Sequence, residues 1–243
     1  YKLEGLATKP PLPLTSKGKQ TSKILIFVFL LTVIFLATLI NSDLIVLNPI
    51  GLAQQLTLVI ASLFFMYFLG LFICGKLSLS EKKAFGSILL ICVASILFWA
   101  GYEQAGSSLN LFTRDFTNRL IANFEIPTAW FQSINSIFII LLSPFFASLW
   151  INLGRRLTHP CYGLKCAAGL LMMAFGFIVM FFAAQFAASG LKVAPTWLIS
   201  TYFLHTVGEL CISPVALSAI SKLSPKRFTG QMMGLFTLTY SIG

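Results

Sequence analysis

Long apolar runs alternate with short polar stretches along the chain after residue 23. The runs lie at 24–41, 53–75, 83–112, 128–152, 165–188, 195–221 and 229–243. A helix needs about 20 apolar residues to cross a bilayer, and several runs have that length. Backbone polar groups in lipid must be satisfied internally, so each run is interpreted as a helix, and continuous apolar runs disfavour a β-barrel. The pattern predicts an all-α polytopic membrane protein.

Both ends of the sequence are interpreted as cut. The chain begins at Tyr1 without an initiator Met or a signal peptide, and its last run, 229–243, is too short to cross a bilayer. We therefore expect this chain to be part of a longer protein. Residues 1–23 are polar and contain Pro10, Pro11 and Pro13, which is typical of a loop or linker.

Composition agrees with a lipid-facing surface. Hydrophobic residues make up 57% of the chain and charged residues only 10%, whereas a soluble domain carries about 25% charged residues. The net charge of +10 raises the question of nucleic-acid binding. The basic residues lie between the apolar runs rather than along one face, so we expect no nucleic-acid partner.

The basic residues also predict an orientation. Lys and Arg number 14 in the stretches 1–23, 76–83, 153–165 and 222–228, against 3 in the alternate stretches 42–52, 113–127 and 189–194. Cytoplasmic loops of membrane proteins carry an excess of Lys and Arg. The first set of loops is therefore predicted to face the cytoplasm.

Two acidic residues lie within apolar runs, while the other five lie in or beside loops. Glu103 is in the segment FWAGYEQAGSSLNLF, residues 98–112, and Glu209 is in LHTVGELCISPVALS, residues 204–218. A carboxylate at that depth costs several kcal/mol unless it is paired, protonated or hydrated. Both glutamates are therefore candidate functional residues.

On an ideal helix, the residues around Glu103 form a polar stripe. Trp99, Glu103, Gly106 and Asn110 fall on one face at 100° per residue. An aromatic ring, an acid, a small residue and an amide on one face indicate a cavity wall. The alternatives are a polar contact between helices without a ligand and, for Trp99, simple packing.

The helix predicted around Glu209 has polar residues along one side and a proline that removes one backbone hydrogen bond. His205, Glu209 and Ser213 are four residues apart, and Pro214 frees the carbonyl of Leu210, which predicts a kink and a candidate hinge. The alternatives are a packing histidine at His205 and a static kink at Pro214. Gln132, Asn135 and Ser136 place further polar groups in the run 128–152, where amides also serve simply to bond a neighbouring helix.

Catalysis and metal binding have no clear signature. Of the five cysteines, only Cys161 and Cys166 are close together, and no histidine lies at a zinc-site spacing from them. No nucleophile and base stand out as a pair. We expect no metal site, no cofactor and no enzymatic activity.

Three segments identify a resemblance to the proton-dependent oligopeptide transporters of the major facilitator superfamily. FWAGYEQAGSSLNLF resembles their seventh transmembrane helix, IPTAWFQSINSIFIILLSPFFASLW their eighth, and GELCISPVALSAISKLSPKRFTGQMMG their tenth helix and the start of the eleventh. The resemblance implies that residues 83–243 form the C-terminal transmembrane bundle. Residues 24–75 then resemble an accessory helix pair, and residues 1–23 a cytoplasmic linker.

The resemblance also implies roles for individual residues. Glu103 matches the proton-binding carboxylate of the seventh helix. Trp99 and Tyr102 match positions that line the peptide pocket. Asn135 and Glu209 match the pair that holds the α-amino group of the peptide, since a carboxylate suits an ammonium group and an amide can orient it.

Three further positions carry implied roles at the edges of the site. Ser213 matches a pocket residue, and Asp115 matches an acid that closes the outer gate with a basic residue of the N-terminal bundle. Phe236 stands at a pocket position where the eleventh helix often has Trp. Ser136 stands where the eighth helix usually has Pro, which leaves the local kink unsupported. The residues that bind the peptide carboxylate, and the ExxER-type motif, belong to the N-terminal bundle and lie outside this sequence.

The function implied by the resemblance is proton-coupled symport of di- and tripeptides across the cytoplasmic membrane. The proton gradient would drive it without a cofactor, and the partners would be peptide, protons, the lipid bilayer and the missing N-terminal six-helix bundle. A multi-pass protein of a bacterial inner membrane is expected. The alternatives are a symporter of the same family for nitrate or an amino-acid derivative, and a proton-relay or structural subunit of a membrane complex.

Overall fold

The computed structural model describes residues 49–75, 77–121, 123–156 and 162–243. The chain divides into two compact units, Tyr1–Leu56 and Thr57–Gly243, and the description below concerns the second. The predicted linker at 1–23 and the first apolar run at 24–41 lie outside the described residues.

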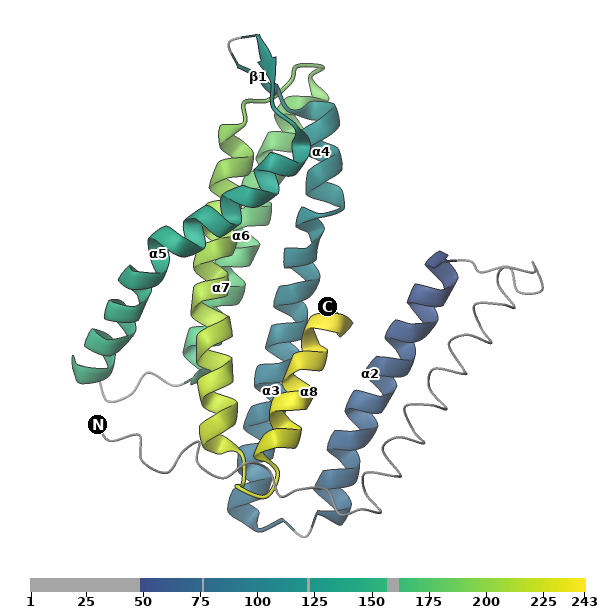
Figure 1. Cartoon of the computed structure of the whole chain (residues 1–243), viewed down its shortest axis with the longest axis vertical. Helices are drawn as coiled ribbons and strands as arrows, with labels where there is room; N and C mark the ends of the chain where they lie inside the picture. The colour runs from purple at the N-terminus through teal and green to yellow at the C-terminus, as the bar shows by residue number, and fades with distance from the viewer. Residues whose placement is uncertain (1–48, 76, 122, 157–161) are drawn as a thin grey trace, which may run out of the picture. The chain divides into compact units, whose positions relative to one another are not determined.

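Helices account for nearly all of the second unit (Figure 1). They are α2 (Pro49–Cys74, which begins in the first unit), α3 (Leu79–Tyr102), the short 3-10 helix η1 (Glu103–Ala105), α4 (Ser108–Phe116), α5 (Thr128–Arg156), α6 (Tyr162–Ala188), α7 (Thr196–Leu223) and α8 (Thr229–Ile242). Five stretches of the described residues are long and apolar enough to cross a membrane, at Gln54–Ile73, Leu79–Phe116, Thr128–Gly154, Tyr162–Ala188 and Thr196–Leu223. The predicted all-α polytopic fold is confirmed.

Small residues bring α6 and α7 together along their length (Figure 1). A Cβ atom on Gly169 would lie 2.8 Å from the carbonyl oxygen of Gly208, and a Cβ atom on Gly208 would lie 2.8 Å from the carbonyl oxygen of Gly169. Farther along, a Cβ atom on Gly176 would lie 2.5 Å from the ring of His205. Without a hydrophobic driving force in lipid, this close packing of backbones is what holds membrane helices together.

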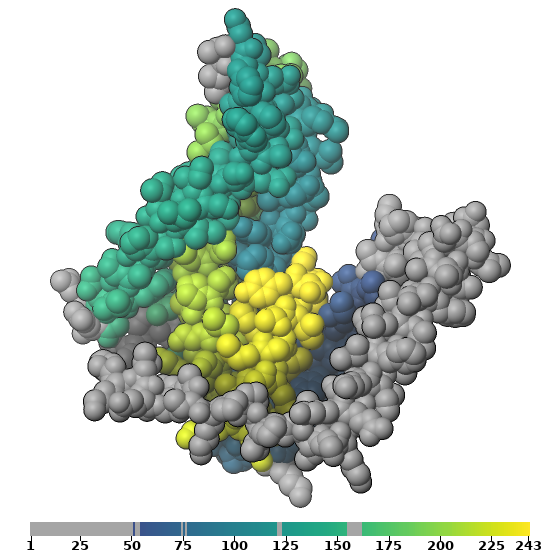
Figure 2. Space-filling model, viewed as in Figure 1, coloured from purple at the N-terminus to yellow at the C-terminus, as the bar shows by residue number. Residues whose placement is uncertain are grey.

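A phenylalanine-rich core joins α3, α7 and α8. Phe85, Ile88, Ile220, Met232 and Phe236 are all buried in it. Helix α8 contacts both α3 and α7, and in the space-filling view it lies beside α7 and in front of part of α3 (Figure 2). This packing fixes the position of α8 beside the polar residues at the end of α3.

The two ends of the helical unit are each tied by loop contacts. At one end Ser78 and Glu81 form a capping box that starts α3. Glu81 also forms an ion pair, at 3.3 Å, with Arg227, which lies in the connection between α7 and α8. At the other end Thr117 bridges to Val193 between α6 and α7. The alternation of loops between two sides that the basic residues predict therefore agrees with the structure.

The stretch 113–127, predicted only as a loop, contains a small antiparallel hairpin. Strand β1 (Leu120–Ile121) pairs with β2 (Phe124–Glu125), and Asn123 between them has φ of 66°, a left-handed conformation that Asn tolerates. Arg119 forms an ion pair with Glu125 and donates to the carbonyl of Ile126 at 2.8 Å.

Candidate substrate site

The helix that carries Glu103 is interrupted at that residue. Regular α-helix ends at Tyr102, the 3-10 turn Glu103–Ala105 follows, and α4 begins at Ser108. Gln104 spans the break, because its amide nitrogen donates to Ala100 O at 3.3 Å and its amide oxygen accepts from Ser108 Oγ at 2.7 Å. A short 3-10 segment within a longer helix often marks a functional site.

This break corrects the prediction of one straight polar stripe. The run 83–112 is not a single α-helix, so the 100° spacing does not continue beyond Tyr102. Trp99 is 8% exposed and faces the packed side, whereas Glu103 and Gly106 are exposed. The stripe fails because a 3-10 turn advances about 120° per residue, which rotates the following side chains out of register.

A hydrogen-bond network centred on Asn135 joins α3, α5 and α7. The amide nitrogen Nδ2 of Asn135 donates to the hydroxyl of Tyr102 and, at 3.4 Å, to Oε2 of Glu209. Its Oδ1 accepts from the hydroxyl of Thr206, which also lies 2.7 Å from the carbonyl oxygen of Tyr202. The structure thus brings together Tyr102, Asn135 and Glu209, three residues predicted to bind substrate, and adds Thr206, which the sequence interpretation did not single out.

The network borders a cavity of about 220 Å³. The cavity is lined by Tyr102, Glu103, Ala105, Gly106, Gln132, Asn135, Ser136, Tyr202 and His205. Polar and apolar side chains both line it, and Glu103 contributes a carboxylate. Among the described residues no Lys or Arg pairs with either Glu103 or Glu209. Acidic and amide groups without a resident cation make this cavity suited to a cationic ligand.

Aromatic rings form one wall next to the network. Trp99 contacts Tyr102 with ring centroids 4.9 Å apart and Tyr240 of α8 with centroids 4.4 Å apart. Phe236, predicted to line the pocket, is only 1% exposed and is buried in the phenylalanine-rich core instead. The α8 residue that reaches the aromatic wall is Tyr240, one turn later, which the sequence interpretation missed.

Three other candidate residues take no part in this network among the described residues. Ser213 has a buried hydroxyl with no partner among the described residues. Asp115 lies at the other end of α4, where it pairs with the neighbouring Arg114 at 2.7 Å, and both side chains are well exposed. His205 packs its ring against Gly176 and Phe177 of α6, so packing accounts for most of its environment.

Pro214 lies inside α7 without ending the helix. The carbonyl of Leu210 that Pro214 frees accepts a hydrogen bond from the indole nitrogen of Trp150, at 3.4 Å, from α5. Lys165 lies over the same indole ring, 4.4 Å from the ring centroid. The candidate hinge is therefore held by a specific partner from a neighbouring helix.

Replacing Trp150 with Phe is expected to destabilise the intact protein by about 1 kcal/mol, because the aromatic packing stays while the carbonyl of Leu210 loses its donor. The measurement is thermal unfolding in detergent. Trp130→Phe is the matched control, since Trp130 is 59% exposed and no hydrogen bond from its indole is found among the described residues. Equal melting temperatures for the two variants would show that the contact is unimportant.

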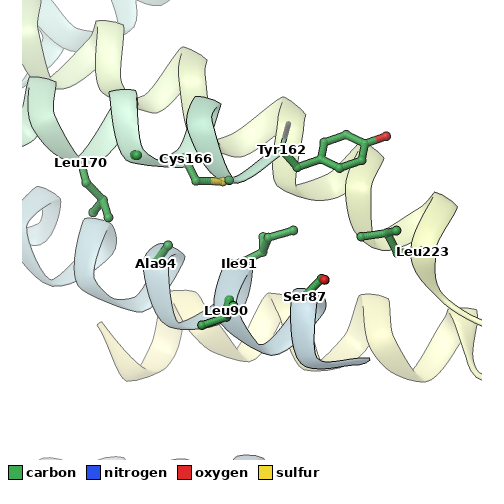
Figure 3. A pocket seen from close by; sticks show the side chains of 10 residues that line it. Ser87, Leu90, Ile91, Ala94, Tyr162, Cys166, Leu170 and Leu223 are labelled. Atoms are coloured by element: carbon green, nitrogen blue, oxygen red, sulfur yellow. The ribbon is translucent and has the colours of Figure 1, made fainter. Parts of the chain in front are cut away.

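A larger cavity of about 460 Å³ lies elsewhere, between α3, α6 and the end of α7 (Figure 3). It is lined by Ser87, Leu90, Ile91, Ala94, Tyr162, Gly163, Cys166, Ala167, Leu170 and Leu223. These side chains include no carboxylate, lysine or arginine. A charged solute would have no counter-ion there, so the smaller polar cavity remains the candidate site.

An antiparallel set of membrane-spanning helices with carboxylates beside a polar cavity within the spans is the architecture of a solute transporter. The sequence matches the POT family over residues 19–243. The chain therefore belongs to the POT family of transporters.

Individual relatives agree with this assignment. The chain is 40% identical, over 213 residues, to the peptide transporter YePEPT of Yersinia enterocolitica, covering 87% of this chain and 42% of that protein. It is 27% identical to a di-/tripeptide transporter of Lactococcus lactis subsp. cremoris, covering 97% of this chain and 48% of that protein. The chain thus spans less than half the length of these curated relatives.

A solved structure supports the fold directly. The crystal structure of a peptide transporter of the POT family in complex with alafosfalin superimposes with a TM-score of 0.80 at 32% identity, covering 98% of this chain and 47% of that one. The architecture described above is therefore that of part of a POT transporter, as the three quoted segments indicate.

Proposed function

We propose that the intact protein is a proton-coupled symporter of di- and tripeptides, and that this chain supplies the binding site for the amino end of the peptide. The observation that carries the proposal is the contact of Asn135 with Glu209 and Tyr102 at the edge of an acidic cavity. A peptide ammonium supplies the cation that these groups lack. The relatives called peptide transporters support a peptide as the substrate.

The test is uptake into liposomes that contain the purified intact transporter. An imposed inward proton gradient is expected to drive accumulation of a labelled dipeptide, with proton entry when peptide is added. Accumulation of nitrate or a free amino-acid derivative without accumulation of dipeptide would favour the alternative substrates. Proton entry that is independent of every solute would favour a proton-relay subunit.

Glu81 near the start of α3 pairs with Arg227, which lies between α7 and α8. We place this end of the helical unit on the cytoplasmic side. The support is the excess of basic residues in that set of loops. In a cysteine-free intact protein, an impermeant thiol reagent added outside is expected to label Lys192→Cys and to leave Lys82→Cys unlabelled. The opposite pattern would reverse the orientation.

We propose that Asp115 belongs to an outer gate, the role that the family resemblance implies for it. Its ion pair with Arg114 is exposed and therefore contributes little stability, so Asp115 can exchange Arg114 for a basic residue of the N-terminal bundle. Asp115→Ala is expected to favour outward-open states. Spin-label distances across the outer mouth measure this, and unchanged distances would remove Asp115 from the gate.

A further inference from the structure

The amide of Asn135 has partners of two kinds. Tyr102 and Thr206 present hydroxyl groups, each of which can donate or accept a hydrogen bond, whereas an ionised Glu209 can only accept. In the structure Nδ2 faces Tyr102 and Glu209, and Oδ1 faces Thr206. This orientation satisfies the carboxylate of Glu209 when no cation is bound beside it.

When an ammonium group lies between Asn135 and Glu209, the side of the amide that faces it has to accept a hydrogen bond instead of donating one. An ammonium has three donors and no acceptor, so Asn135 must present Oδ1 to it rather than Nδ2. The amide therefore has to turn over by about 180° when the amino end of a substrate binds. This step rests on the proposed function, because it takes the substrate to carry a free ammonium.

We propose that Thr206 is the positioning residue that allows this turn. Before substrate binds, its hydroxyl donates to Oδ1 of Asn135. After the turn it accepts from Nδ2, and its own proton goes to the carbonyl of Tyr202, which already lies 2.7 Å away. Tyr102 changes in the opposite sense, from acceptor to donor.

Burial explains why a hydroxyl is required at this position. Thr206 is 0% exposed and Asn135 is 8% exposed, so bulk water has little access to replace a missing partner. A side chain that only donated would satisfy one orientation of the amide and oppose the other. A methyl group would satisfy neither, and a buried amide without a partner is costly. Before substrate binds, water in the adjoining cavity can reach the Asn135 amide, whereas a bound peptide takes that space, so the cost falls mainly on the bound state.

The experiment compares Thr206→Val, Thr206→Ala and Thr206→Ser in the intact transporter. Inhibition constants are measured for Ala-Ala and for N-acetyl-Ala-Ala, together with thermal unfolding. The Val and Ala variants are expected to lose affinity for Ala-Ala by about tenfold, equivalent to about 1.4 kcal/mol, with little change for the acetylated peptide. The Ser variant is expected to keep the affinity of the original protein, because it keeps the hydroxyl.

Thr201→Val is the matched control on the same helix. Thr201 is also 0% exposed, but within the described part of the chain its hydroxyl bonds only to the backbone carbonyls of Trp197 and Gly176. It is expected to change thermal stability without changing the ratio of the two affinities.

Two results would overturn the role of Thr206. One is an equal loss of affinity for both peptides in the Val and Ala variants, and the other is a Ser variant that behaves like the Val variant. The unmodified transporter reports separately on the proposed function. If it does not bind Ala-Ala, or binds both peptides equally, the assignment of the amino-end site fails before any Thr206 variant is considered.

Discussion

Replacing Glu209 with Gln in the intact transporter is expected to weaken the binding of peptides with a free amino end by at least about thirtyfold, or about 2 kcal/mol. This value is the lower end of the cost of removing one partner of a buried charge pair. Glu209 is partly buried and accepts from Asn135 at 3.4 Å, which ties its carboxylate to a residue that lines the polar cavity. The neutral amide of Gln keeps the shape of the side chain but cannot balance an ammonium.

Peptide chemistry separates this role from a structural one. An N-acetylated dipeptide has no ammonium, so its weak binding should be nearly the same before and after the substitution. Glu125→Gln is the matched control, because Glu125 is an acid of the outer hairpin whose ion pair is with Arg119. If Glu209→Gln reduces affinity equally for free and acetylated peptides, Glu209 does not bind the amino end.

The helices were predictable because crossing a bilayer imposes a simple rule. Runs such as 165–188 and 195–221 have to be long and apolar, and they recur as α6 and α7 within a few residues. The break at Glu103 was not predictable in this way. Its sequence, EQAGSS, interrupts a run whose average hydropathy still fits one span, and hydropathy carries no information on the hydrogen bonds of the backbone.

Contacts between helices were the other part that the sequence could not supply. Asn135 meets Tyr102 and Thr206 across sequence separations of 33 and 71 residues, and nothing in the periodicity of one helix specifies its rotation against another. A shift of one turn along α8 places Tyr240, rather than Phe236, beside Trp99. The resemblance to the family identified Asn135 and Glu209 as a pair, and the structure places them in contact.

The second large effect is expected at Glu103, which we propose carries the transported proton. Glu103 begins the 3-10 turn between α3 and α4. It lines the same cavity as Tyr102 and Asn135. No ion pair with Glu103 is found in the part of the chain that the structure describes. A counter-ion would therefore come from outside the described residues, for example from the N-terminal bundle or from the substrate. A carboxyl that takes a proton from one side of the membrane and releases it on the other would couple proton movement to alternating access.

Glu103→Gln mimics the protonated form and cannot release a proton. Reconstituted in liposomes, this variant is expected to lose proton-driven accumulation of dipeptide, because uptake against a gradient requires a proton to be released on the inner side. Exchange of internal for external dipeptide should remain measurable, since exchange requires no net movement of protons. Glu125→Gln, with its acid in the outer hairpin, should retain both activities. Continued accumulation of dipeptide by the Glu103→Gln variant under an imposed pH gradient would place the transported proton on another residue.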